Sequence, residues 1–116
     1  MVGIPGAAGY ASSKAAIRNH TRTVALWRAQ QGLTIRCNAI LPTAIMTPMW
    51  GPMLDTGPDR GRGAAALDAD TPLRRFGTPE EVAALSVLLA GDEGRDMTGT
   101  DQFLDGGLLA GSAAPG

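Results

Sequence analysis

A long helical pattern followed by a strand-like run limits the possible folds of this chain more than any other feature. Small and apolar residues form a broad surface from about Ala11 to Gln31, and Gly32 is a natural helix stop. Thr34 to Leu41 is short, rich in β-branched residues and ended by Pro42, which predicts a buried strand. We therefore expect an α/β fold in which the helix is covered on two sides, by a sheet and by a partner subunit.

The predicted strand places alternate residues on opposite faces of a sheet. Ile35, Cys37, Ala39 and Leu41 share one face, which predicts that Cys37 is a small, unreactive core residue. Asn38 lies on the opposite face, where we expect it to make structural hydrogen bonds.

The stretch after this strand has two interpretations. Residues 42–49 follow the carboxyl end of the strand, where open α/β sheets bind their ligands. A plain strand-to-helix connection explains the same residues equally well. Gly51 to Asp70 is rich in Gly, Pro, Asp and Ala, and such a long irregular segment is typical of a lid.

The last third of the chain predicts one more helix and one more strand. Thr78-Pro79-Glu80-Glu81 has the residues of a capping box, with proline at the first helical position, and Gly91 ends the helix. Asp101 to Asp105 then predicts a second short strand, closed by the pair Gly106-Gly107.

Composition bounds the class of protein. A length of 116 residues allows one domain at most, and a formal net charge of −1 with scattered arginines predicts no basic face for nucleic acid. The longest apolar run is too short to span a bilayer, and no basic-then-apolar leader follows Met1. The single Cys37 excludes an internal disulfide and fits a reducing compartment. We expect a cytoplasmic protein without a membrane segment or a metal site.

Tyr10 and Lys14 carry the clearest chemical signal. Their i, i+4 spacing places them on one face of a helix, one turn apart. Acid–base work near neutral pH requires the pKa of a tyrosine to fall by roughly three units from about 10, or about 4 kcal/mol. One ammonium about 4 Å away in a partly screened site supplies about 4 kcal/mol by Coulomb's law. Lys14 can therefore bring the pKa of Tyr10 into the range needed for catalysis near neutral pH. Taken alone, however, a Y-x-x-x-K spacing is more simply explained by chance.

Four blocks together resemble the C-terminal half of the short-chain dehydrogenase/reductase family. Tyr10-Ala-Ser-Ser-Lys14 resembles its Y-x-x-x-K, and Ile35 to Pro42 resembles its strand ending in N-x-[I/V]-x-P-G. Residues 72–82 and 98–107 resemble its later blocks. The amino-acid sequence of the first forty residues is similar to the sequences of secondary-alcohol and hydroxysteroid dehydrogenases.

The resemblance implies the architecture of the whole chain. We identify residues 1–116 as a partial domain of this family, with the catalytic helix, the substrate lid and the last two strands. The fold is then the C-terminal portion of a doubly wound, Rossmann-like parallel sheet, whose N-terminal nucleotide-binding half we expect to be missing.

The resemblance also implies roles for the matching positions. Tyr10 would be the general acid/base, and Lys14 would depress the pKa of Tyr10 and hydrogen-bond the nicotinamide ribose. Pro42, Ile45 and Thr47 would line the nicotinamide end, with the Ile45 backbone and the Thr47 hydroxyl meeting the carboxamide. The cofactor would be NAD or NADP, the substrate a small-molecule secondary alcohol or ketone, and the full-length protein a homo-oligomer.

Two departures from the family pattern affect these expectations. Thr43 stands where the family usually has glycine, and the family's phosphate-binding turn, ribose selector and catalytic serine and asparagine would all precede Met1. We therefore expect the isolated chain to be marginally folded, to bind the cofactor very weakly and to be inactive. One alternative is a truncated, non-catalytic interaction protein that pairs with full-length relatives; another is a decayed gene without a functional product.

Overall fold

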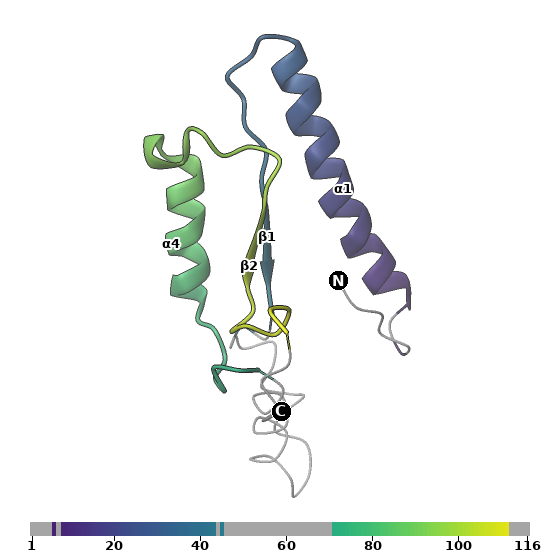
Figure 1. Ribbon diagram of the computed structural model, residues 1–116, viewed down its shortest axis with the longest axis vertical. Coiled ribbons are helices and arrows are strands. Elements are labelled where there is room, and N and C mark those ends of the chain that lie inside the picture. The colour runs from purple at the N-terminus through teal and green to yellow at the C-terminus, as the bar shows by residue number, and fades with distance from the viewer. Residues whose placement is uncertain (1–5, 7, 44, 46–70, 112–116) are drawn as a thin grey trace, which may run out of the picture. The chain divides into compact units, whose positions relative to one another are not determined.

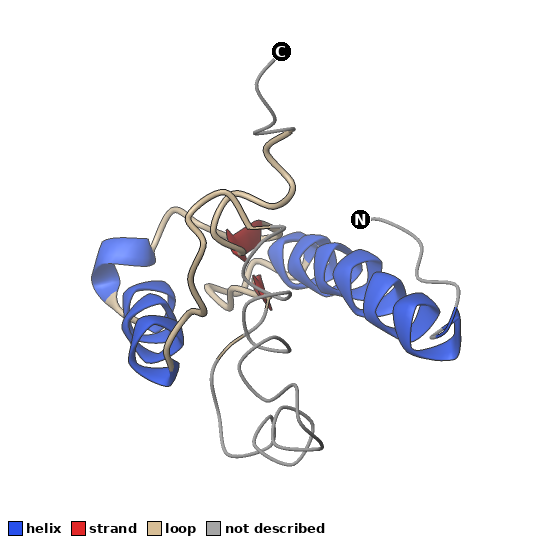
Figure 2. Cartoon of the chain, turned by 90° about the horizontal axis from the view of Figure 1, so that it is seen from below, coloured by secondary structure: helices blue, strands red, loops and turns tan. Residues whose placement is uncertain are grey.

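The computed structural model describes residues 6, 8–43, 45 and 71–111. The chain divides into two compact units: the first unit is Met1–Ile40 with Ser86–Gln102, and the second unit is Leu41–Leu85 with Phe103–Gly116. Figures 1 and 2 show the helices and strands, which are, in chain order, α1 (Ala8–Gln30), β1 (Ala39–Pro42), α4 (Pro79–Ala90), the 3-10 helix η3 (Asp92–Gly94) and β2 (Asp101–Leu104).

α1 begins at Ala8, three residues earlier than predicted, and ends at Gln30, two residues before the glycine that the sequence predicts as its stop. The N–H of Leu33 donates to the carbonyl of Arg28 at 3.2 Å, and the N–H of Gly32 donates to the carbonyl of Ala29 at 3.0 Å. Gly32 has a φ of 70°, as this type of helix end requires. The prediction that Gly32 stops the helix is confirmed.

The two strands form a parallel pair. The N–H of Ala39 donates to the carbonyl of Thr100 at 2.9 Å, and the N–H of Thr43 donates to the carbonyl of Leu104 at 3.0 Å. Both strands therefore advance by four residues between these bonds, which is the parallel register. Figure 1 shows β1 and β2 side by side. The prediction of a second short strand after residue 100 is confirmed.

β1 is shorter than predicted because the residues before it are held by a turn instead of a second strand. The Cys37 N–H donates to the Thr98 hydroxyl at 3.1 Å, and the Cys37 carbonyl accepts from the Gly99 N–H at 2.7 Å. Gly99 has a φ of 69°, a conformation that does not continue a strand ladder. Residues 33–38 consequently lack regular secondary structure, Ile35 is exposed and Cys37 is half-buried. The prediction of one buried face through Ile35 and Cys37 is wrong.

The start of α4 follows the predicted capping pattern. The Glu81 N–H donates to the Thr78 hydroxyl oxygen at 3.2 Å, and Pro79 occupies the first helical position. The Thr78 hydroxyl in turn lies 3.2 Å from the Glu81 carboxylate. Leu89 is the buried residue of the helix, which ends at Ala90, directly before Gly91.

The described residues cover a narrow face of α1. Thr21 and Ala25 are its buried residues, and a Cβ at Gly99 would lie 3.5 Å from the Ala25 methyl, so the turn packs directly against the helix. Ile17 and Leu26 are exposed. The two-sided cover that the sequence predicts is not provided by the described part of this chain.

No helix among the described residues combines the length and the apolar character needed to cross a membrane.

Candidate functional site

The predicted catalytic pair lies near the start of α1, in the first unit. Tyr10 and Lys14 both fall within the helix, so their i, i+4 spacing places them one turn apart on one face, as predicted. The Lys14 Nζ atom lies 5.4 Å from the centroid of the Tyr10 ring. A cation at this distance is attracted to the face of the ring, which favours keeping the two side chains together.

Both side chains of the pair are open to solvent in this chain. Tyr10 is 63% exposed and Lys14 is exposed, while the Ser13 hydroxyl donates locally to the Tyr10 carbonyl at 2.7 Å. A phenol can donate or accept a proton, and an ammonium offers three donors and a positive charge. The arrangement can therefore present a proton donor and a positive charge to one ligand.

A cluster of two arginines and one aspartate lies on the same unit, further along α1. Arg18 donates to the Asp101 Oδ2 atom from Nε at 3.0 Å and from Nη2 at 2.7 Å, and Arg22 donates to the same oxygen from Nη2 at 2.6 Å. The Asp101 side chain is 8% exposed. Its Oδ1 atom is buried and accepts no hydrogen bond from the described residues. This Arg18–Asp101–Arg22 cluster joins α1 to the first residue of β2.

The residues of this cluster are not among the functional residues that the sequence predicts. The signal that was present is a repeat at four-residue intervals, because Tyr10, Lys14, Arg18 and Arg22 follow one another on successive turns of one helix. The repeat alone does not identify the acidic partner, since Asp101 lies 83 residues after Arg18.

Asn38 holds the turn that leads into β2. Its side-chain amide donates to the Met97 carbonyl at 2.8 Å, and its carbonyl oxygen accepts from the Thr100 N–H at 3.1 Å and from the Thr100 hydroxyl at 2.7 Å. The prediction that Asn38 is a structural hydrogen-bonding residue is confirmed. The amide fixes residues 97–100 against the start of β1.

The second unit contains the predicted nicotinamide-contacting residues that the structure describes. Pro42 ends β1 and is exposed, whereas Ile45 is half-buried and forms an isolated parallel bridge with Gly77. A Cβ at Gly77 would lie 2.5 Å from the Ile45 Cδ1 atom, so the glycine is what admits the Ile45 side chain. Thr47 lies outside the described residues, as does the predicted lid, 51–70.

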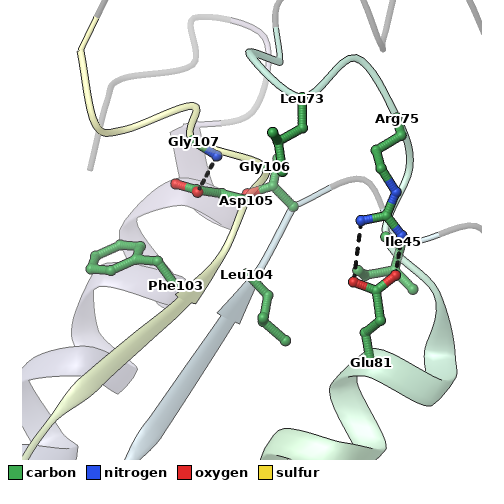
Figure 3. A pocket seen from close by; sticks show the side chains of 11 residues that line it. Ile45, Leu73, Arg75, Glu81, Phe103, Leu104, Asp105, Gly106 and Gly107 are labelled. Atoms are coloured by element: carbon green, nitrogen blue, oxygen red, sulfur yellow. Dashed lines mark hydrogen bonds and ion pairs between the residues drawn. The ribbon is translucent and has the colours of Figure 1, made fainter.

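A cavity of about 230 Å³ lies in the second unit beside Ile45, and Figure 3 shows its lining from close by. Apolar side chains contribute much of the wall, with an ion pair on one side of the cavity and a glycine turn on another. The lining residues are Thr43, Ile45, Leu73, Arg75, Gly77, Glu81, Phe103, Leu104, Asp105, Gly106 and Gly107. The cavity can hold a small, partly apolar group.

The glycine turn after β2 is fixed by its own aspartate. Asp105 accepts from the Gly107 N–H at 2.9 Å and from the Leu109 N–H at 3.1 Å, and the first of these bonds is drawn in Figure 3. Gly106 and Gly107 have φ values of 61° and 93°, which disfavour other residues. The Gly106 carbonyl accepts from the Leu73 N–H at 3.1 Å, so the turn also holds the segment before α4.

The ion pair at the cavity joins Arg75 to Glu81. The guanidinium donates to both carboxylate oxygens, and Figure 3 shows the two groups facing each other. Hydrogen bonding from Arg75 lowers the pKa of Glu81, with the Thr78 hydroxyl adding to the effect, and the pKa of Arg75 is raised by the same hydrogen bond. The Arg75 guanidinium is therefore paired within the chain, with a carboxylate six residues later.

Comparison with known proteins connects both units to one family. The family model described as enoyl-(acyl carrier protein) reductase matches residues 1–109. The chain is 41% identical over 109 residues to the 3-oxoacyl-[acyl-carrier-protein] reductase FabG of Thermotoga maritima, covering 94% of this chain and 41% of that protein. It is 40% identical over 104 residues to the 3beta-hydroxysteroid dehydrogenase 1 of Eggerthella lenta, covering 90% of this chain and 38% of that protein.

The fold is also similar to solved structures. A short chain dehydrogenase family protein from Francisella tularensis aligns with a TM-score of 0.86 at 28% identity, over 96% of this chain and 47% of that one. The chain therefore spans about two-fifths of the length of the curated relatives it matches and less than half of this solved structure.

Proposed function

The chain belongs to the short-chain dehydrogenase/reductase family of oxidoreductases, and on that premise we propose that it carries the proton-handling part of an NAD(P)-dependent oxidoreductase site. The reaction is reversible hydride transfer between a nicotinamide and a secondary alcohol or ketone. Tyr10 is the general acid/base, and Lys14 is its electrostatic partner.

The observation that carries this proposal is the contact between Lys14 and Tyr10 on the first two turns of α1. The phenol is the only tyrosine side chain of the sequence, and its exposure leaves the hydroxyl accessible to a ligand. A cation held one turn away favours the negative charge that remains on the phenol oxygen after proton donation.

The side chains present fit a nicotinamide cofactor by the chemistry of their donors. The Lys14 ammonium offers three donors, which suit the hydroxyls of a ribose, and it is exposed. Ile45 borders a cavity in the second unit and would meet the carboxamide through its backbone, together with Pro42 and the Thr47 hydroxyl. The bound reduced nicotinamide supplies the hydride that reduces a carbonyl carbon.

Tyr10 completes the chemistry at the oxygen of the substrate. In the direction of reduction, its hydroxyl donates a proton to the carbonyl oxygen as that oxygen becomes an alcohol. In the direction of oxidation, the phenolate takes the proton from the alcohol. Lys14 remains charged throughout and stabilises the phenolate form by Coulomb attraction.

The names of the relatives support the proposed class of substrate. One relative is a reductase of 3-oxoacyl groups, which contain a ketone, and another is a dehydrogenase of 3beta-hydroxysteroids, which contain a secondary alcohol. Both substrates pair a carbonyl or hydroxyl carbon with an apolar body. We propose a substrate of this general kind.

Replacing Tyr10 by Phe in the intact product of the native gene tests the proposal. General acid–base catalysis contributes typically 10²- to 10⁴-fold, so kcat for ketone reduction should fall by about that factor. Cofactor binding, measured by the fluorescence of the reduced nicotinamide, should change little because the ring stays in place. Turnover at the wild-type rate by Tyr10→Phe would overturn the assignment.

One observation favours the alternative of an interaction protein. Leu26 and Trp27, on the second half of α1, are exposed, and an apolar helix face of this kind suits docking to another member of the family. Co-purification of the 116-residue chain with such a relative, combined with an inactive wild-type gene product, would support this alternative instead.

A further inference from the structure

We propose that Asp101 is a positioning residue for the Tyr10–Lys14 pair and that it acts through Arg18 and Arg22. The inference rests on the proposed function, because it concerns the placement of the groups that handle the proton. All the contacts that support it lie within the first unit.

Asp101 receives three hydrogen bonds from α1 on a single oxygen. The donors belong to Arg18 and Arg22, which are one helical turn apart, and the donor–acceptor distances are 2.6 to 3.0 Å. Two attachments on successive turns fix both the rotation of α1 about its axis and its position along that axis. Since the Asp101 side chain is more than nine-tenths buried, water does not replace these contacts cheaply.

The aspartate is itself held in place by the sheet. Its neighbour Thr100 accepts from the Ala39 N–H through its carbonyl and donates to Asn38 through both its N–H and its hydroxyl. Because Ala39 begins β1, the backbone directly before Asp101 is fixed to the strand pair. A rigid support of this kind is what a positioning residue requires.

The geometry of a helix converts a small change at this anchor into a larger one at Tyr10. Tyr10 precedes Arg18 by eight residues, which is about 12 Å along the axis at 1.5 Å per residue. A tilt of about 5° about the anchor would therefore move Tyr10 by roughly 1 Å, and a misplacement of that size can cost about 10²-fold in rate. Tyr10 and Lys14 are both exposed, so their placement depends on where the anchored half of α1 directs the helix.

Charge adds a second effect. Arg18 follows Lys14 by four residues, so the two cations are neighbours on the helix surface, where like charges at this spacing repel. The Asp101 carboxylate draws the Arg18 guanidinium toward β2 and compensates its charge. Without the carboxylate, Arg18 loses this compensating charge one turn from Lys14 and competes more strongly with Lys14 for the same phenolate or ligand.

The experiment compares Asp101→Asn with two other variants in the intact product of the native gene. Asp101→Asn keeps the shape of the side chain and removes its charge. Arg22→Gln loosens one of the two attachments and retains the other, which protects against loss of the fold. Arg36→Gln is the matched control, because Arg36 donates to the carbonyls of Met97 and Gly91 in the same unit, and neither acceptor belongs to α1.

Two readouts are measured on each variant, together with its thermal unfolding midpoint. The first is kcat, which should fall about 10- to 100-fold in Asp101→Asn, less in Arg22→Gln, and stay at the wild-type value in Arg36→Gln. The second is the NMR signal of the Tyr10 ring, identified as the signal that Tyr10→Phe loses. This signal should shift in Asp101→Asn and Arg22→Gln but keep its position in Arg36→Gln.

The possible outcomes separate this inference from the proposed function. If Tyr10→Phe is inactive while Asp101→Asn keeps its kcat and its Tyr10 signal, the positioning role is overturned and the proposed function stands. A loss of thermal stability in Asp101→Asn with unchanged kcat also overturns it, since the residue is then merely structural. Full activity of Tyr10→Phe overturns both statements together.

Discussion

The two units each contain an ion-pair cluster, and the two clusters join residues at very different separations in the sequence. In the first unit, Arg18 and Arg22 reach Asp101 across 83 and 79 residues, and the aspartate side chain is 8% exposed. In the second unit, Arg75 reaches Glu81 across six residues, and both side chains are about half exposed, at 48% and 40%. The first cluster joins a helix to a strand, whereas the second closes a turn before a helix.

The difference shows which kind of pair can define a site. An exposed local pair gains little free energy, because water screens the charges and both side chains lose rotamer freedom. A buried long-range pair is costly to break, since either partner alone is a charge away from water. We therefore expect substitutions in the first cluster to alter fold and activity together, and substitutions in the second to alter local stability alone.

The largest expected effect comes from Arg18→Ala. The change removes two of the three hydrogen bonds to the Asp101 carboxylate, and breaking a buried pair of this kind typically costs about 3–5 kcal/mol. In a denaturant titration, the free energy of unfolding should decrease by an amount close to that cost. Arg28→Ala is the control, because Arg28 lies on the same helix and stacks over Trp27. Equal losses in the two variants would show that pairing with Asp101 adds no more stability than another arginine of the same helix.

A smaller effect is expected at the cap of α4. Thr78→Ala removes the hydroxyl that accepts from the Glu81 N–H, and the loss of such a cap costs about 1 kcal/mol of stability. Thr23→Ala is the control, because the Thr23 hydroxyl bonds back to the Asn19 carbonyl inside α1 and its removal should be close to neutral. A Thr78→Ala variant as stable as the wild type would show that the capping pattern contributes nothing here.

The smallest effect belongs to the exposed pair and depends on pH. Hydrogen bonding from Arg75 lowers the pKa of Glu81 below its ordinary value of 4.5, so the charged form stabilises the folded state above that pH. The contribution is lost as the pH falls through the lowered pKa. Glu81→Gln should therefore be slightly less stable than the wild type at pH 7, and the difference should vanish in acid.

Glu80→Gln provides the matched control for this measurement, since it removes the same charge from the same turn of α4. Thermal unfolding of the three proteins at neutral and acidic pH gives the comparison. A stability difference between the wild type and Glu81→Gln that persists in strong acid would show that the ion pair is not its source.

Sequence reasoning succeeded where the cause of a structure is local. Three predicted features act through bonds within a few residues: the helix stop at Gly32, the capping residues from Thr78 to Glu81, and the Gly106-Gly107 turn. The family was also predicted, because its motifs are local patterns in a fixed order.

Sequence reasoning failed where partners are distant along the chain. The strand predicted from Thr34 begins only at Ala39, because the turn at Thr98 and Gly99 lies opposite Cys37. No pattern near Cys37 indicates that turn. Asp101 was predicted only as a strand residue, since its two arginines lie some eighty residues earlier. The roles of Tyr10 and Lys14 rest on the family motif, and they stay predictions until activity is measured.

A double-mutant cycle on kcat tests the partnership of Tyr10 and Lys14 most directly. The variants are Tyr10→Phe, Lys14→Met and the combination of both, each measured in the intact gene product under the same conditions. If the two side chains act as one unit, the double variant should be about as slow as Tyr10→Phe alone, because Lys14 has no phenolate left to stabilise. If the two losses simply multiply, the side chains act independently and the proposed partnership is contradicted.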